Sequence, residues 1–520
     1  MSIEKIPSAA PASSGVPPSP GRPPATLELS SLDFGSLAKS IQLPFFRALL
    51  FWMAFSLGGA LFLAVVQPGY ALSFLAITAT TGVMLFIWLK SSRKGLPFLP
   101  LLAVQGGIVY AIPLLTRNEV ITEFPSELLL PCAGLFAMHG IALAIGWSLA
   151  RGMGSRPARF RFALPPGERN RQKVLGTIAF AFLGLAILGN LVIFTGLLRS
   201  FSTVIATGLL PIIRTFSDAA MYGGALLGGF TQSRGPSRLL YWISIGGLCV
   251  IKFSGILLSD AIGLCGAVAI GILLGSRKMP WTFLIVMTAI TGFLNQSKFV
   301  MRERYWVGQS FGGPSSLSEM PAFFSEWAAA SIASFTANAD ADQDSSTQTL
   351  FSRINNLQNL LFVAEAMTSL QIPSLHGAGY ATIPPLLIPR IFWPNKPRSH
   401  EGQVLLNVHF ERQPDVESTE ITYIAWGLLP EAIGNLGLFW GPLLIGLALG
   451  FLVGWAEVWS IKKIVLSIEG LIALSLFLLL AISFEMVAGV LITSILQLLV
   501  AVVTGALLIR QYLGKNGRLR

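Results

Sequence analysis

Residues 377–397 read GAGYATIPPLLIPRIFWPNKP, and this stretch determines how the rest of the chain is interpreted. It holds five prolines. Because proline fixes φ and lacks a backbone donor, the stretch cannot form an ordinary membrane-spanning helix. It is also too apolar for an ordinary solvated loop. It contains two fixed cations, Arg390 and Lys396, and therefore predicts a rigid surface at a membrane interface that grips an anion.

The composition places this stretch in an all-α polytopic membrane protein. Of 520 residues, 53% are hydrophobic and 12% are charged, and the mean hydropathy is +0.68. That charged fraction is about half of what globular domains carry. The net charge of +11 fits cytoplasmic loops and contact with anionic headgroups, and we expect no nucleic acid partner. The three cysteines all lie in apolar runs, which favours core packing over disulfides or metal.

The apolar runs predict about twelve transmembrane helices, most of them long enough for about 30 Å of hydrocarbon. Their approximate bounds are 45–66, 70–89, 96–115, 127–149, 174–198, 215–231, 239–257, 260–275, 280–295, 436–459, 467–484 and 488–509. The sixth is short and glycine-rich. Residues 204–216 before it contain Pro211 and Arg214 and are a candidate for an amphipathic piece along the surface.

The basic loops predict the orientation. If both termini are cytoplasmic, the basic loops after spans two, four, six, eight and ten fall on the same side as the basic C-terminus. The one long hydrophilic insertion, between spans nine and ten, then lies outside. From Gln296 to Leu436 it carries 8 Lys and Arg against 13 Asp and Glu, as suits an exported segment.

Five regions follow from this topology. Residues 1–42 are rich in Pro and Ser and predict a disordered cytoplasmic tail. Residues 43–295 hold spans one to nine, 296–435 form one large extracytoplasmic loop, 436–510 hold spans ten to twelve, and 511–520 form a cytoplasmic tail. Within the loop, residues 350–370 predict an amphipathic helix, whereas the Ala- and Ser-rich residues 315–344 predict weak helix at best.

Several polar residues are candidates for chemistry. Arg390, Lys396 and Arg398 either clamp a phosphate or snorkel at the headgroup level, and chemistry alone leaves both interpretations open. For Arg353, with its neighbours Asn355 and Asn356, the residues by themselves favour a solvated helix face.

Other titratable groups give weaker signals. His400 and Glu401 directly follow the cationic cluster and either is a candidate general base, although an exposed loop pair is the simpler interpretation. His139 lies within span four and is a weaker candidate. Lys252 lies near the outer end of span seven, close enough to snorkel. No metal-binding or nucleotide-binding motif occurs in a fitting context, so we expect no cofactor.

Two separated motifs carry a resemblance to a known family. They are Gly377-x-Gly379-Tyr380 with Ile388-Pro-Arg-Ile-Phe-Trp-Pro-Asn-Lys-Pro397, and Trp426-Gly427-x-x-x-Glu431-Ala-x-x-Asn435-x-Gly437. Together they resemble the Wzy-type oligosaccharide repeat-unit polymerases of bacterial surface polysaccharides, or O-antigen polymerases. The motifs cover about 60 residues, and the topology of many spans with one large outer loop is similar.

The resemblance implies a glycosyltransferase of the bacterial inner membrane that acts without metal or nucleotide. Its donor would be a glycan on undecaprenyl pyrophosphate in the outer leaflet, and its acceptor a single lipid-linked repeat unit of a surface polysaccharide or exopolysaccharide. Membrane lipids would surround it. Chain-length regulator and flippase proteins would be candidate partners.

The resemblance also implies roles for individual residues. Arg390 and Lys396 would hold the pyrophosphate, with Arg353 as a second cation, because fixed cations stabilise a leaving pyrophosphate without protonating it. A base would come from His400, Glu401 or Glu431, among which the sequence singles out none. Substrate binding is assigned to Arg398, Trp393, Tyr380 and Asn435.

Three other interpretations stay open. A transporter or flippase of a lipid-linked glycan also has about twelve spans, but the division into nine and three spans argues against its usual internal repeats. A lipid-linked glycan ligase, which joins a finished polymer to another acceptor, is closer in chemistry. A non-catalytic assembly subunit is the third.

Overall fold

A computed structural model describes residues 34–40, 42–116, 118–157, 168–195, 203–232, 237–276, 280–305, 314, 316–340, 355–388, 393, 396–421, 424–464 and 467–517. These residues form helices joined by turns and loops, with no strand among them. The helices are α1 (Phe34–Ser40), α2 (Gln42–Val66), α3 (Pro68–Lys90), α4 (Phe98–Leu115), α5 (Glu119–Thr122), η1 (Ser126–Leu128), α6 (Leu129–Ala150), α7 (Glu168–Phe194), α8 (Thr203–Gln232), α9 (Arg238–Ser254), α10 (Leu258–Ser276), α11 (Trp281–Asn295), α12 (Lys298–Tyr305), η3 (Leu317–Glu319), α13 (Met320–Asp340), α15 (Leu357–Thr368), α16 (Ala378–Ala381), α17 (Ile383–Leu386), α18 (Glu401–His409), α19 (Val416–Ile421), α20 (Leu428–Ser460), α21 (Ile468–Ala481) and α22 (Ala488–Gly517).

The all-helical, multi-pass character agrees with the sequence. Within the described residues, seven helices are long and apolar enough to cross a membrane. The bent pair α11 and α12, whose axes differ by 58°, would make eight. Each of the twelve predicted spans overlaps a helix, but α21 and the apolar part of α10 are shorter than a full crossing. The count of twelve spans, the outer position of the loop and the side of the termini stay predictions.

Several local expectations need correction. The predicted tail ended at residue 42, but α1 already forms at Phe34, whose side chain is buried. Residues 203–232 form one helix, α8, rather than a surface piece followed by a span. The Ala- and Ser-rich segment expected to be weakly helical contains α13, because its Phe323 and Trp327 are buried together against α11 and α12.

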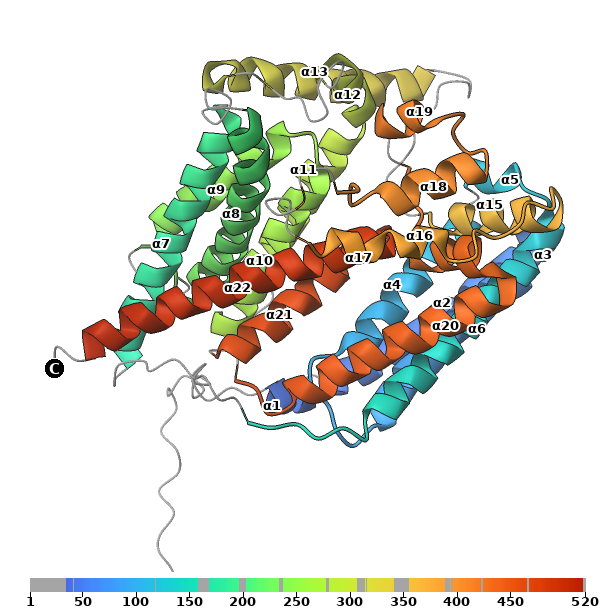
Figure 1. The fold of residues 1–520 in the computed structure, drawn as a ribbon, viewed down its shortest axis with the longest axis horizontal. Helices are drawn as coiled ribbons and strands as arrows, with labels where there is room; N and C mark the ends of the chain where they lie inside the picture. Colours follow the sequence, from blue (N-terminus) through green and yellow to red (C-terminus); the bar gives the residue numbers. More distant parts are fainter. Residues whose placement is uncertain are drawn as a thin grey trace, which may run out of the picture.

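The helices gather in two groups, with the long insertion at one end. Helices α2, α3, α4 and α6 pack with α20 on one side, and α7 to α11 pack together on the other (Figure 1). The long final helix α22 crosses between them and contacts both α17 and α8. Helices α12, α13, α18 and α19 lie at the end of the molecule opposite α1 (Figure 1). The described helices of the insertion, α12 to α19, are called the cap below.

Among the described helices, α6 and α20 have the most extensive contact, and glycines make this contact possible. An ideal Cβ on Gly446 would lie 2.6 Å from the carbonyl oxygen of His139, and one on Gly454 would lie 2.7 Å from that of Trp147. A Cβ on Gly450 would overlap the carbonyl oxygen of Leu143. Three small residues at four-residue spacing therefore let the two backbones touch, as in other membrane helix pairs.

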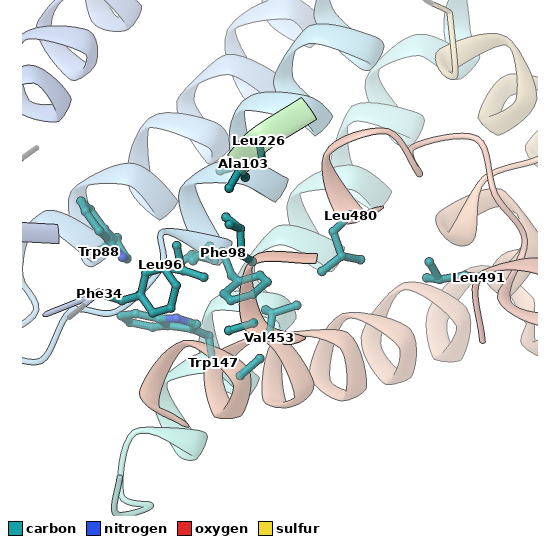
Figure 2. Close-up of a cluster of buried hydrophobic side chains, with 14 of the residues drawn as sticks. Phe34, Trp88, Leu96, Phe98, Ala103, Trp147, Leu226, Val453, Leu480 and Leu491 are labelled. Atoms are coloured by element: carbon teal, nitrogen blue, oxygen red, sulfur yellow. The ribbon is translucent and has the colours of Figure 1, made fainter. Parts of the chain in front are cut away.

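A buried carboxylate fixes the far end of the same pair. Glu457 on α20 accepts hydrogen bonds from the indole Nε1 of Trp88 at 2.7 Å and of Trp147 at 3.0 Å. Figure 2 shows both indoles in the apolar cluster that Phe34 also enters. The backbone N–H of Phe34 donates to the carbonyl oxygen of Lys463, which holds α1 against the end of α20. One glutamate thus joins α3, α6 and α20.

At its other end α20 folds back on itself. Gly437 has φ 88° and ψ 169°, so residues 428–436 form a separate short helix before the long part of α20 begins. A Cβ on Gly441 would lie 2.6 Å from the carbonyl oxygen of Ala432, which shows how sharply the chain turns. Residues 438–460 alone span about 35 Å at 1.5 Å per residue. The short helix of residues 428–436 is therefore separate from this long part of α20, and it contacts the cap.

The second helix group contains its own ionic contact. Lys252 on α9 is only 8% exposed, and its Nζ lies 2.5 Å from Asp218 of α8 and 3.9 Å from Asp260 of α10. Arg214 lies 3.8 Å from Asp260. Lys252 was expected to snorkel, but the structure buries it because two carboxylates compensate its charge. The contact joins three helices.

The glycine contact of α6 with α20 gives a first prediction. Gly450→Ala should lower the free energy of unfolding by about 1–3 kcal/mol, because the added methyl group overpacks a backbone contact. Gly134→Ala is the matched control on α6, where an ideal Cβ meets nothing within 4 Å. There alanine should leave stability unchanged or raise it by up to about 1 kcal/mol. Thermal unfolding of the purified protein in detergent measures both, and equal effects of the two variants would contradict the close contact.

Candidate functional site

The two sequence motifs, which are separated in the chain by residues 398–425, meet in the structure. The backbone N–H of Gly377 donates to the carbonyl oxygen of Asn435 at 2.9 Å, and that of Gly379 donates to its Oδ1 at 2.9 Å. The Asn435 Nδ2 donates to the carbonyl oxygen of Glu431 at 3.0 Å, and its side chain is fully buried. Asn435 thus joins α16 to the short segment of α20. Its predicted contact with substrate would require this junction to open.

Backbone geometry explains the glycines of both motifs. Three glycines have positive φ values: 85° at Gly377, 78° at Gly427 and 88° at Gly437. No other glycine of the described residues has a positive φ. Other residues rarely adopt this conformation. Gly427 also lies against the carbonyl oxygen of Phe484, 3.0 Å from an ideal Cβ, and its N–H donates to the carbonyl oxygen of Glu485. The glycines therefore shape the turns that bring the motifs together.

Glu431 occupies a structural position. It is 1% exposed, and its Oε2 accepts a 2.7 Å hydrogen bond from the backbone N–H of Ala488, the first residue of α22. At a helix N-terminus the unpaired backbone donors and the helix dipole offset part of the cost of burying this carboxyl group. The bond anchors α22 to the short segment of α20. A general base needs access to substrate, which this buried contact does not give to Glu431.

Tyr380 lies beside Glu431 with its hydroxyl buried and without a hydrogen-bond partner in the described residues. Burial, and then the charge of Glu431, raise the pKa of Tyr380. The phenol therefore stays protonated at neutral pH. It is a donor available to an oxygen of a bound molecule.

The proline-rich segment lies beside the start of α22. The Lys396 Nζ donates to the carbonyl oxygens of Leu386 at 2.7 Å and Ile388 at 2.6 Å, so this cation partly stabilises its own loop. Arg398 is exposed, and Trp393 is 41% exposed. Arg390 and Arg353, the two other predicted cations, lie outside the described residues.

His400 and Glu401 begin a helix and are half-buried, so the expectation of an exposed loop pair is wrong. The His400 Nδ1 lies 3.3 Å from Ser399 Oγ, and burial lowers the pKa of the imidazole. The next turn packs on α16, where a Cβ on Gly402 would lie 3.0 Å from the carbonyl oxygen of Gly379. A neutral imidazole near the motif junction can accept a proton.

The sequence did not single out Arg412, which the structure makes the best anion-binding candidate. Its Nη2 donates to Asn359 Oδ1 at 2.8 Å, and its guanidinium lies 5.1 Å from the ring centre of Phe362 and 5.6 Å from that of Trp426. Its Nη1 is buried without a partner, and no ion pair of the described residues involves it. Burial lowers its pKa to about 10. A desolvated cation without a carboxylate favours an incoming anion.

A network of hydrogen-bonded, buried asparagines lies beside Arg412. Asn359 donates to Asn356 Oδ1 at 2.7 Å and to the carbonyl oxygen of Trp426, and Asn356 donates to the hydroxyl of Tyr110. Asn407 accepts the indole N–H of Trp426 at 2.6 Å, and its own Nδ2 has no partner in the described residues. Asn355 and Asn356 are buried, so the expected solvated helix face is wrong for these two residues, whereas Arg353 lies outside the described residues. The network leaves donors, rather than acceptors, to be satisfied.

One sequence signal pointed toward this network. Asn359 interrupts the apolar face of the predicted helix between Leu357 and Leu360, and a polar residue there needs a buried partner. Nothing comparable marks Arg412, whose partner Asn359 is 53 residues away.

His139 lies in the wall of a cavity of about 80 Å³ below the asparagine network, together with Gln105, Tyr110 and Asn356. Its Nδ1 has no partner in the described residues. The cavity is large enough for ordered water, which could satisfy such groups. The part of the chain that the structure describes holds no group of three potential metal ligands.

The burial of His400 predicts a pH dependence of stability. Because the folded state lowers its pKa below the ordinary value of about 6.5, the unfolded chain binds the proton first as pH falls. Stability should therefore decrease below about pH 6.5, and His400→Gln should flatten that decrease. His376→Gln, at an exposed position, is the control and should keep the wild-type slope. Melting temperatures measured between pH 5 and 8 test this prediction. Parallel curves of melting temperature against pH for wild type and His400→Gln would refute it.

Comparison with known proteins leaves the site to be interpreted from its own geometry. No family model, no curated protein and no solved structure matches the chain.

Proposed function

We propose that the chain is a glycosyltransferase that polymerises oligosaccharide repeat units carried on undecaprenyl pyrophosphate at the outer face of the bacterial inner membrane. The observation that carries the proposal is Arg412, a half-buried residue whose Nη1 is buried and unpaired and which has no carboxylate partner among the described residues. It lies directly against Trp426, a residue of the second motif. A pyrophosphate diester is the anion that such a site fits in a membrane protein.

The proposed reaction moves a glycan from one lipid carrier to a sugar hydroxyl on another. The acceptor oxygen forms a bond to the anomeric carbon of the donor, and the bond from that carbon to the pyrophosphate oxygen breaks with its electron pair. The acceptor hydroxyl loses its proton to His400, whose burial keeps it neutral. Arg412 stabilises the charge that develops on the pyrophosphate, with Lys396 and Arg390 as further cations of the same loop.

The loop edge also supports a lipid-linked substrate. Leu387, Ile388 and Trp393 of the proline-rich segment are 47%, 40% and 41% exposed. This segment lies against the start of α22, where an ideal Cβ on Gly489 would be 3.2 Å from the carbonyl oxygen of Ser399. An exposed apolar strip beside a candidate membrane helix is a suitable place for a polyprenyl tail. The pyrophosphate would then lie between this strip and Arg412.

The first test of the function is the size profile of lipid-linked glycans in a deletion strain. Deletion should leave single repeat units on the lipid carrier, the wild-type gene should restore a ladder of longer products, and Arg390→Ala should not. Full-length polymer that fails to be attached to its final acceptor would instead identify a ligase. Single units that accumulate only on the cytoplasmic leaflet would identify a transporter, and a normal ladder with Arg390→Ala would favour a non-catalytic subunit.

The assignment of Arg412 has its own test. Arg412→Gln should lower the polymerisation rate about 10²–10³-fold, the usual effect of losing one transition-state donor or cation. Arg412→Lys should recover only part of the lost polymerisation rate, because an ammonium group lacks the planar pair of donors of a guanidinium group. Arg304→Gln is the control, since it removes an exposed cation of α12 that pairs with Glu326 of α13. The rates are compared at equal protein level and melting temperature, and equal loss with Arg304→Gln would exclude a specific role for Arg412.

A further inference from the structure

A groove lies at the other end of the molecule, where the start of α2 meets the end of α3 and the end of α1. Its volume is about 520 Å³, within the ~300–1,000 Å³ range of ligand pockets. The groove is lined by Lys39, Gln42, Leu43, Phe46, Phe86 and Lys90, with Leu49 and Leu89 behind them. None of these residues belongs to the candidate site in the cap.

The walls of the groove are apolar and face outward. Leu43 is 59% exposed, Phe46 is 50% exposed and Phe86 is 47% exposed, whereas Leu49 is buried and closes the floor. Both α2 and α3 are candidate membrane spans. Exposed apolar side chains on such helices contact hydrocarbon, so a hollow between them is filled by part of a lipid chain.

The rim of the groove is cationic. Lys39 lies in the last turn of α1, and Lys90 is the last residue of α3. Both are exposed, and no ion pair within the described residues involves either. The Lys90 Nζ lies 4.9 Å from the ring centre of Phe86, which orients the ammonium above the apolar wall. No carboxylate of the described residues lines the groove, so none of them compensates its positive charge.

We infer that this groove binds an anionic phospholipid of the bilayer, with its phosphate between Lys39 and Lys90 and an acyl chain along Leu43, Phe46 and Phe86. The charge selects the headgroup, since a zwitterionic lipid would bring a second cation to two lysines. The position at the helix ends matches the headgroup level, and the apolar hollow below it matches a chain. The inference is independent of the proposed polymerase activity.

The consequence for the fold is local and specific. A lipid held by both lysines joins α1 to the hairpin of α2 and α3, to which α1 is otherwise connected through residue 41 and a few contacts. Binding to the folded state alone raises stability in proportion to the logarithm of ligand concentration. An anionic lipid should therefore raise the melting temperature of the full-length protein more than a zwitterionic lipid with the same chains.

Native mass spectrometry of the full-length protein, purified in detergent, tests the groove with phosphatidylglycerol and with phosphatidylcholine of identical chains. We expect retained phosphatidylglycerol adducts and few phosphatidylcholine adducts. Lys39→Gln and Lys90→Gln should each weaken phosphatidylglycerol binding about fivefold and together about 25-fold, from ~1 kcal/mol per lysine near a lipid surface. Lys462→Gln, an exposed cation at the same end but outside the groove, should have no effect.

A second pair of variants separates the hollow from general electrostatic attraction. Leu43→Trp fills the groove while keeping both lysines and should reduce phosphatidylglycerol binding. Leu61→Trp, at a position of α2 that is 61% exposed and outside the groove, should not. Equal binding of the two lipids, unchanged binding in the double lysine variant, or equal loss with Leu43→Trp and Leu61→Trp would each overturn the inference. Retention of undecaprenyl phosphate with exclusion of phosphatidylglycerol would also overturn it.

Discussion

The backbone contact between α6 and α20 is the constraint on which the rest of the arrangement depends. Glycines at 446, 450 and 454 bring the two helices together without side chains between them. Glu457 then fixes the angle of the pair by accepting both indole N–H groups. Because α20 is held along this whole length, its turn at Gly437 has a defined place and direction. The short helix of residues 428–436, which precedes this turn in the chain, places Glu431 and Asn435 at the cap.

The motif junction is held by backbone N–H groups that donate to Asn435 and Glu431, so these motif residues have structural roles. Gly377, Gly379 and Asn435 form the junction, and Glu431 anchors α22. Among the described residues of the cap, unsatisfied donors belong to other groups, which include the Tyr380 hydroxyl, the Asn355 and Asn407 amides and the Arg412 guanidinium. One of these donors, Arg412, is charged. Unpaired donors of this kind favour a ligand rich in oxygen acceptors and negative charge.

Hydropathy predicted the helices well because it is a local property that each segment carries in its own sequence. It failed where distant packing decided the outcome. Helix α13 forms in an Ala- and Ser-rich stretch because Phe323 and Trp327 find a buried surface on α11 and α12. The two motifs suggested that Tyr380, Glu431 and Asn435 lie together, and the structure brings their segments into contact; their roles toward a substrate stay predictions. The burial of Arg412 depends on Asn359, 53 residues away, and no local pattern in the sequence encodes that distance.

The order of synthesis gives the α6 and α20 contact a further meaning. About 280 residues separate the end of α6 from the start of α20, which at roughly 5–20 residues per second corresponds to ~15–60 s of translation. During that interval the surface of α6 that will meet the glycines faces lipid. The indoles of Trp88 and Trp147 have no glutamate to bind, because Glu457 has not yet been made. The packing of α3 and α6 is therefore completed only after α20 has been made. A nascent chain that stops before α20 leaves the contact surface of α6 without its partner helix.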